Sequence, residues 1–197
     1  MALPSRPALL ISFLAITVLA PATRAQESTG TSVGFGVGGG GSIPVGESKE
    51  ALRAGFHVQS FVRVEFGKSP VAVRGDFSYE NFDLSAAVAG SSAKIPGGAA
   101  TLLGGLAQAQ TYLRRTGVRP YVLLGVGGYR LQAEFDDPEV PSRSERGLSA
   151  DAGGGVAFTL GGFNAYAESR FEHLFSSGEA LNLDAVRIVE ITFGVVF

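Results

Sequence analysis

Apolar and polar residues alternate with a period of two along most of the chain. In the stretch "SPVAVRGDFSYENF", Val71, Val73 and Phe77 share one parity, whereas Arg74 and Asp76 share the other. Successive side chains of a β-strand point to opposite faces, so this stretch has one apolar face and one charged face. Helical spacing is poor, because the 28 glycines keep interrupting it. The pattern therefore predicts a protein built of strands.

Eight segments of the chain show this alternation, and each is long for a strand. Strands of globular sheets usually have about five or six residues, whereas a tilted strand needs roughly 9–11 residues to cross a bilayer. The length of the segments therefore favours strands that span a membrane. The eight predicted strands cover about residues 31–43, 53–66, 70–82, 98–114, 118–134, 147–160, 163–175 and 185–197.

The apolar face of these segments is free of charge away from the segment ends. A soluble sandwich buries its apolar face, but a membrane barrel turns that face to lipid, so alternation alone leaves both architectures open. In the fifth segment, Tyr121, Leu123 and Tyr129 are assigned to the apolar face. An arginine at the middle of a bilayer costs about 2–4 kcal/mol, so the missing charges favour the membrane barrel.

Long and short connections alternate strictly between the eight segments. Outer-membrane barrels have short periplasmic turns and longer external loops, and an even number of strands brings both termini to the periplasmic side. We therefore predict an all-β fold, an eight-stranded antiparallel transmembrane β-barrel with meander topology. The long connections are 44–52, 83–97, 135–146 and 176–184, and the short ones are 67–69, 115–117 and 161–162.

The first 25 residues have the features of a secretory signal peptide. Arg6 precedes an uncharged apolar stretch at 8–20 that is too short to span a bilayer, and small residues lead up to Ala25. Cleavage after Ala25 divides the chain into a signal peptide, 1–25, and a barrel domain, 26–197. An uncleaved N-terminal membrane anchor is the alternative.

Composition excludes several other classes of protein. Cysteine is absent, so the chain has no disulfide framework, zinc ribbon or thiol nucleophile. With only two histidines, a His-rich metal site is not expected, and we predict neither a metal nor a cofactor. The formal net charge of −2 provides no basic surface for a nucleic acid.

The polar parity of the segments would line the barrel lumen with charged side chains. Eight strands enclose a space just wide enough for side chains, and buried charges must be paired because lone ones are very costly. We expect a packed network of salt bridges and hydrogen bonds that holds the barrel rigid, with a polar conduit or proton path as the alternative. The residues predicted for this interior network are Arg63, Glu65, Arg74, Asp76, Glu80, Arg130, Glu134, Asp151, Glu168, Arg170, Glu172 and Glu190.

Three stretches of the chain carry a family resemblance: "RPYVLLGVGGYRL", "FNAYAESRFEHL" and the closing "ITFGVVF". With the strands around them, they resemble the small eight-stranded outer-membrane β-barrels, such as outer membrane protein X, the membrane domain of outer membrane protein A and the opacity-type barrels. The resemblance covers essentially all of residues 30–197. It implies an outer-membrane protein, without enzymatic activity, that acts through extracellular loops in surface interaction, adhesion or envelope integrity.

The same resemblance implies partners for the barrel. Outer-membrane lipid and lipopolysaccharide would surround it, and the barrel-assembly machinery and periplasmic chaperones would handle it during biogenesis. A monomer is expected. In the family, a terminal phenylalanine behind alternating apolar residues is recognised by the assembly machinery, and the resemblance assigns that signal to Ile191, Phe193, Val195 and Phe197.

Two other functions are carried as alternatives. The stretch "RFEHLFSSGEALN" weakly resembles the outer-membrane lipid A deacylases, in which a histidine and a serine two residues later face the lipid. Here Ser176 follows His173 by three residues, which puts it on the opposite face of a regular strand, and Ser177 follows by four. A hydrolase needs its nucleophile and base within hydrogen-bond reach, so we predict that the chain is not an enzyme. A soluble periplasmic barrel of the lipocalin type, which binds an apolar ligand, is the second alternative.

Overall fold

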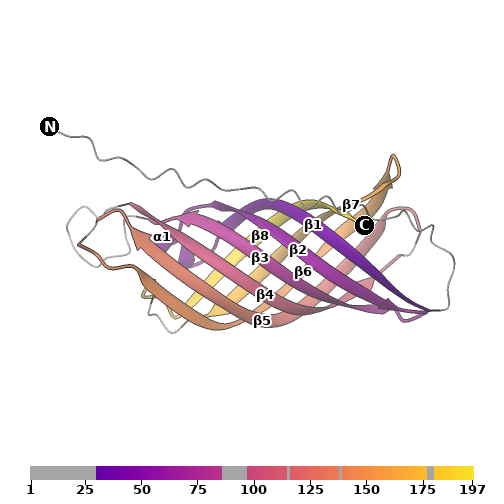
Figure 1. Ribbon diagram of the computed structural model, residues 1–197, viewed down its shortest axis with the longest axis horizontal. Helices are drawn as coiled ribbons and strands as arrows, with labels where there is room; N and C mark the ends of the chain where they lie inside the picture. The colour runs from indigo at the N-terminus through magenta and orange to yellow at the C-terminus, as the bar shows by residue number, and fades with distance from the viewer. Residues whose placement is uncertain (1–29, 86–96, 115, 138, 177–179) are drawn as a thin grey trace.

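Eight antiparallel strands form a closed barrel in the order of the chain, with β8 paired to β1 (Figure 1). The computed structural model describes residues 30–85, 97–114, 116–137, 139–176 and 180–197. The predicted all-β meander barrel is confirmed, while the predicted signal peptide lies outside the described residues. The strands are β1 (Thr31–Pro44), β2 (Gly55–Phe66), β3 (Val71–Asp83), β4 (Gly98–Tyr112), β5 (Arg119–Phe135), β6 (Arg143–Leu160), β7 (Phe163–Phe175) and β8 (Ala185–Val196), and one short helix, α1 (Ser48–Ala51), follows β1.

Most strand boundaries agree with the predicted ones within two residues. The largest difference is at β6, which begins at Arg143 instead of residue 147 because its ladder with β5 continues to the pair Arg143 and Ala133. The stretch "RSER" has no apolar alternation, so its sequence does not look like a strand. No helix among the described residues is long and apolar enough to cross a bilayer.

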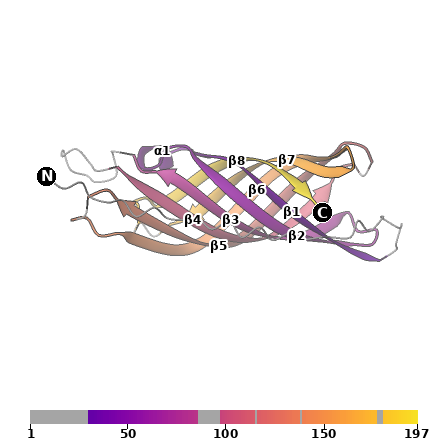
Figure 2. The ribbon, with the colours of Figure 1, turned by 45° about the horizontal axis from the view of Figure 1, so that its top comes forward.

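The two ends of the barrel are different. Figures 1 and 2 show α1 at one end and the C-terminus at the other. We call the end with α1 and the connections β3–β4, β5–β6 and β7–β8 the loop end, and the end with the short turns and Phe197 the turn end. At the turn end, Phe35 and Phe197 exchange both backbone hydrogen bonds, at 3.1 and 2.7 Å, and so help to close the barrel.

The outer wall is apolar and the lumen contains the charges, as the alternation predicts for a membrane barrel. Large apolar side chains on the outside remain exposed around the whole barrel. Phe77, for example, is 58% exposed, whereas its strand neighbour Asp76 is buried. Among the exposed apolar side chains are Val33, Phe35, Val58, Val62, Val73, Leu124, Val126, Leu148, Leu160, Phe163, Phe171, Ile191 and Phe193.

The predicted faces of β5 are wrong. Tyr121, Leu123 and Tyr129 are buried in the lumen, and the exposed face of this strand carries Arg130 and Glu134. Both faces of β5 bear large apolar residues over most of its length, because this part of the lumen is itself apolar. Polarity therefore could not identify the outward face, and the two charged residues near the loop end were assigned to the wrong side of the wall.

Glycines on the inner face of β1 make room for aromatic rings. A Cβ added to Gly36 would collide with the Phe61 ring, and one added to Gly38 would collide with the hydroxyl of Tyr166. The rings therefore lie against the β1 backbone, where any larger residue would exclude them. This is how a narrow lumen holds several aromatic side chains.

We predict that Gly127→Ala destabilises the barrel. A Cβ at this position would collide with the carbonyl oxygen of Gly105 and lie 2.8 Å from the Cα of Leu106, so β4 and β5 would have to move apart. Overpacking of this kind costs about 1–3 kcal/mol. The measurement is the midpoint of urea unfolding. Unfolding is read from gel electrophoresis of unheated samples, in which the folded barrel migrates faster than the unfolded chain. Gly75→Ala is the control, because its Cβ would meet no atom within 4 Å, and equal midpoints for the two variants would contradict the prediction.

Candidate functional site

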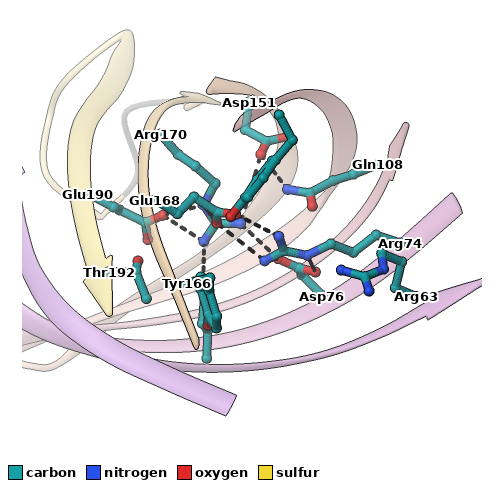
Figure 3. A network of polar contacts seen from close by, with 12 residues as sticks. Arg63, Arg74, Asp76, Gln108, Asp151, Tyr166, Glu168, Arg170, Glu190 and Thr192 are labelled. Atoms are coloured by element: carbon teal, nitrogen blue, oxygen red, sulfur yellow. Dashed lines mark hydrogen bonds and ion pairs between the residues drawn. The ribbon is translucent and has the colours of Figure 1, made fainter. Parts of the chain in front are cut away.

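Arg74 on β3 lies between the carboxylates of Asp76 and Glu168 in the middle of the lumen (Figure 3). Its Nε and Nη2 donate to the two carboxylate oxygens of Asp76, at 2.7 and 2.8 Å, and its Nη1 donates to Glu168 at 2.6 Å. The guanidinium carbon lies 3.8 Å from the centroid of the Phe61 ring, a cation–π contact. Arg74 and Asp76 are two residues apart on one strand, so both side chains enter the lumen.

Arg170 on β7 forms the second centre of the network. It donates from Nε to Glu190 at 2.8 Å, from Nη1 to Asp76 at 2.9 Å and from Nη2 to Gln59 at 2.6 Å. Asp151 is a more distant neighbour, at 3.8 Å. Arg170 therefore links β7 to β2, β3 and β8, and Asp76 is shared by both arginines.

Aromatic residues lie between this network and the turn end. Tyr121 donates its hydroxyl hydrogen to Glu168 at 2.7 Å, and Gln59 donates its amide to the hydroxyl of Tyr166 at 3.1 Å. The Phe61 and Tyr166 rings meet edge to face, with centroids 5.6 Å apart. The tyrosines thus bind the charged network with their polar tips and pack with their rings. The buried apolar cluster on this side consists of Phe61, Tyr121, Leu123, Ala157 and Tyr166, with Tyr112 and Val196 packed against it.

A larger apolar cluster fills the lumen on the loop-end side of the network. It combines strand residues with α1 and the connection before β8, so the loops themselves contribute to it. Together with the aromatic cluster, it encloses the charged network between two apolar layers. Its members are Ala51, Leu52, Phe82, Leu84, Ala100, Leu102, Tyr129, Leu131, Ala133, Leu174, Ala180, Leu181, Val186 and Ile188.

Three carboxylates meet in the part of the network where positive charge is scarce. Glu80, Glu172 and Glu190 are fully buried, and one oxygen of each lies within 4.8 Å of the others. Of the three, Glu190 has an arginine partner, Arg170. Ionised carboxylates this close repel one another. Oxygen ligands of this kind suit a hard cation, but a carboxylate cluster by itself selects no ion, so we assign no metal to it.

Most of the predicted interior residues lie in the lumen, but not all of them belong to one network. Arg63 and Glu65 form a separate pair near the turn end, 3.0 Å apart, and Arg63 also donates to the hydroxyl of Tyr112 at 2.6 Å. Arg130 and Glu134 lie on the outer wall, so their assignment to the interior is corrected. The predicted residues that are buried together are Arg74, Asp76, Glu80, Asp151, Glu168, Arg170, Glu172 and Glu190.

Uncharged residues complete the network, and the predicted set omitted them. Gln108 donates to Asp151, and His57 bridges Ser42 and Thr192, at 3.0 and 2.8 Å. All of them have the inward parity of their strands, and that parity was the available signal. The predicted network contains only charged side chains, so these uncharged residues are absent from it.

Glu145 is a further buried carboxylate, placed by the sequence in a loop. It accepts hydrogen bonds from the hydroxyl of Tyr129 at 3.0 Å, the hydroxyl of Ser176 at 3.1 Å and the backbone N–H of Ala180 at 3.2 Å. It therefore fastens the connection between β7 and β8 to the inside of the barrel. The early start of β6 puts Glu145 in a strand, with its side chain inward.

The suspected hydrolase residues do not meet. His173 has the outward parity of β7, and its ring packs edge to face on the Phe175 ring, with centroids 4.7 Å apart. Ser176 instead points inward and binds Glu145, so the barrel wall separates the two side chains. Ser177, the other serine considered, lies outside the described residues.

The residues assigned to an assembly signal line the outside of β8. Ile191 and Phe193 are exposed on the outer wall, Val195 is half-buried on the same parity, and Phe197 is exposed beyond the last strand residue. This is the apolar, lipid-facing edge of the last strand.

The sequence matches the family model described as "Outer membrane protein beta-barrel domain" over residues 8–197. Neisserial surface protein A, a solved structure, is similar with a TM-score of 0.61 at 15% identity, covering 85% of this chain and 97% of that chain. OprG from Pseudomonas aeruginosa has a TM-score of 0.56 at 12% identity and covers 86% and 98%. At these identities the likeness concerns the fold alone. No curated protein matches the sequence.

We predict that Glu168→Gln and Glu80→Gln have different effects on stability. Glu168 binds Arg74 and Tyr121, and breaking a buried ion pair from one side costs about 3–5 kcal/mol. Glu80 has two carboxylates as close neighbours, so neutralising it relieves repulsion and should leave stability equal or higher.

The measurement is again the midpoint of urea unfolding at neutral pH, with electrophoretic mobility as the readout. The two substitutions are isosteric and both sites are buried, so each variant serves as the control for the other. A similar loss of stability in both would show that the carboxylates are equivalent and that the arginine partners do not decide the effect.

Proposed function

This chain belongs to the outer membrane protein β-barrel domain family and is an integral protein of the outer membrane, and from that premise we propose that it acts without catalysis, through its loop end. The proposed role is surface interaction or adhesion, or support of envelope integrity. In this role the barrel is a rigid anchor, and the connections at the loop end make the contacts.

The filled lumen is the observation that carries this proposal. Two arginines and their carboxylates occupy its middle, and apolar clusters pack on both sides of them. An eight-stranded barrel has room for side chains and little else. A rigid plug therefore agrees better with the packing than a polar conduit or proton path does.

The position of His173 supports a non-enzymatic role. A hydrolase of the deacylase type needs a serine within hydrogen-bond reach of its histidine on the lipid side. His173 instead contacts Phe175, and Ser176 binds Glu145 on the other side of the wall. The lipocalin-type alternative does not fit either, because a soluble barrel would not place its large apolar side chains on the outside.

The loop end offers polar groups for contacts outside the membrane. Arg53, Asp83 and Asp136 line a hollow there, beside the start of β4. Loops on a rigid scaffold commonly carry the binding function of a protein, and this scaffold holds its loops from inside through Glu145 and α1. Outer-membrane lipid and lipopolysaccharide are the proposed surroundings, and a monomer is the proposed state.

We also propose that Ile191, Phe193, Val195 and Phe197 are recognised during biogenesis. The barrel-assembly machinery would bind this apolar edge, after periplasmic chaperones have carried the unfolded chain. The support is their arrangement. All four have the outward parity of β8, and this strand closes the barrel by pairing with β1.

The proposed role predicts that a mutation in a loop can remove the function of the protein without affecting the folding of the barrel. Replacing residues 86–96 with a short Gly/Ser linker leaves β3 and β4 intact, since these strands end at Asp83 and begin at Gly98. We expect the variant to fold and reach the outer membrane, but to lose most of its ability to restore surface attachment and detergent resistance to a deletion strain.

Gly75→Ala, with its loops unchanged, is the control and should restore both properties. Full rescue by the linker variant would contradict a role for this loop. Altered lipid A masses on expression would indicate an enzyme instead, and sustained single-channel conductance in planar bilayers would indicate a conduit.

A further inference from the structure

Two arginines face each other on the outer wall near the loop end. Arg130 on β5 and Arg146 on β6 are direct cross-strand partners, and both are exposed. Side chains at such positions have Cβ atoms about 4.5–5.5 Å apart, and like charges directly opposite each other destabilise a sheet. On a membrane-facing wall, an anion bound between the two guanidinium groups would offset this repulsion.

The described part of the protein does not supply that anion. Neither guanidinium makes a hydrogen bond or ion pair with another described residue. Glu134, the next outward acid on β5, accepts a hydrogen bond from Gln132 at 2.8 Å. It lies four residues from Arg130, which is about 13 Å along a strand. The positive pair is therefore open to a ligand.

The pair lies where the apolar belt of the wall ends. On its turn-end side, Leu148 and Val126 are 70% and 66% exposed. On its loop-end side, the next outward pair is polar, Gln132 with Ser144. Basic side chains at such a boundary meet the headgroups of membrane lipids, whose phosphates they attract.

Beside the arginines, on the side of the apolar belt, the outer wall carries a strip of two residues without side chains. Gly105 and Gly128 are cross-strand partners one row closer to the turn end, and both face outward. A Cβ added to either would meet no atom closer than 3.9 or 3.5 Å, so the packing of the barrel does not require glycine there. The strip leaves space beside Leu148 for an apolar chain that continues from a headgroup at the arginines.

We propose that Arg130 and Arg146 bind the phosphate of a phosphorylated lipid in the outer leaflet, with an acyl chain of that lipid along Gly105 and Gly128. Guanidinium groups bind phosphate with two parallel hydrogen bonds, and two of them at one site neutralise the charge of the headgroup. The bound phosphate also removes the repulsion between the arginines. The site holds a lipid on the wall next to the loops, and it does not depend on what the loops themselves bind.

The test uses the full chain, refolded in detergent micelles that contain bis-phosphorylated lipid A, and native mass spectrometry to count the bound lipid. We expect the double variant Arg130→Gln, Arg146→Gln to lower the ratio of lipid-bound to free protein about tenfold, as the loss of charge-assisted hydrogen bonds implies. The double Lys variant keeps the charges but lacks the bidentate geometry, and it should bind at an intermediate level. Arg187→Gln is the control, because Arg187 is exposed on β8 opposite His173, not opposite another arginine.

Two further measurements identify the ligand. Lipid A without phosphate should bind the parent chain and the double Gln variant equally, and millimolar inorganic phosphate should not displace the phosphorylated lipid. Equal binding of bis-phosphorylated lipid A to the parent chain and the double Gln variant would overturn the proposal. Displacement by inorganic phosphate would overturn it as well, because the site would then be one for free anions. Folding of each variant is checked by its electrophoretic mobility before and after heating.

Discussion

Two buried arginines that share one aspartate hold the interior of this barrel together. Asp76 accepts hydrogen bonds from Arg74 and from Arg170, and these arginines extend the network to Glu168 and Glu190. Removing an ion from water costs several kcal/mol, so the arrangement is favourable only because each guanidinium meets more than one carboxylate. Closure of the sheet provides those partners, since it brings β3, β7 and β8 around one narrow space.

The surroundings of the network strengthen it. Apolar clusters lie on both sides of the charged layer, and a low local dielectric makes each ion pair and hydrogen bond stronger while raising the cost of any unpaired group. Glu80 and Glu172 are the exception, because they add negative charge where positive charge is scarce. The lumen is therefore well compensated around the arginines and poorly compensated around this carboxylate group.

A closed lumen leaves two surfaces for function, the loop end and the outer wall. The loop end is held from inside, because Glu145 binds the connection between β7 and β8 and α1 packs into the apolar cluster. The outer wall is apolar until the row of Arg130 and Arg146, where polar positions begin. The proposed lipid site and the loop end therefore lie at one level of the barrel, and the rigid interior keeps their relative positions.

The sequence by itself determined the number of strands, the approximate bounds of most of them, the alternation of long and short connections, and the shared inward face of Arg74 and Asp76. These features are local, because a lipid-facing strand needs one apolar face and residues two apart share a face. Only the tertiary structure decided which face of β5 turns outward, since Tyr121 and Val122 are both apolar and no polar residue marks the lumen there. It also decided that Arg74 meets Glu168, 94 residues away, because contacts across the lumen depend on the closure and stagger of the whole sheet.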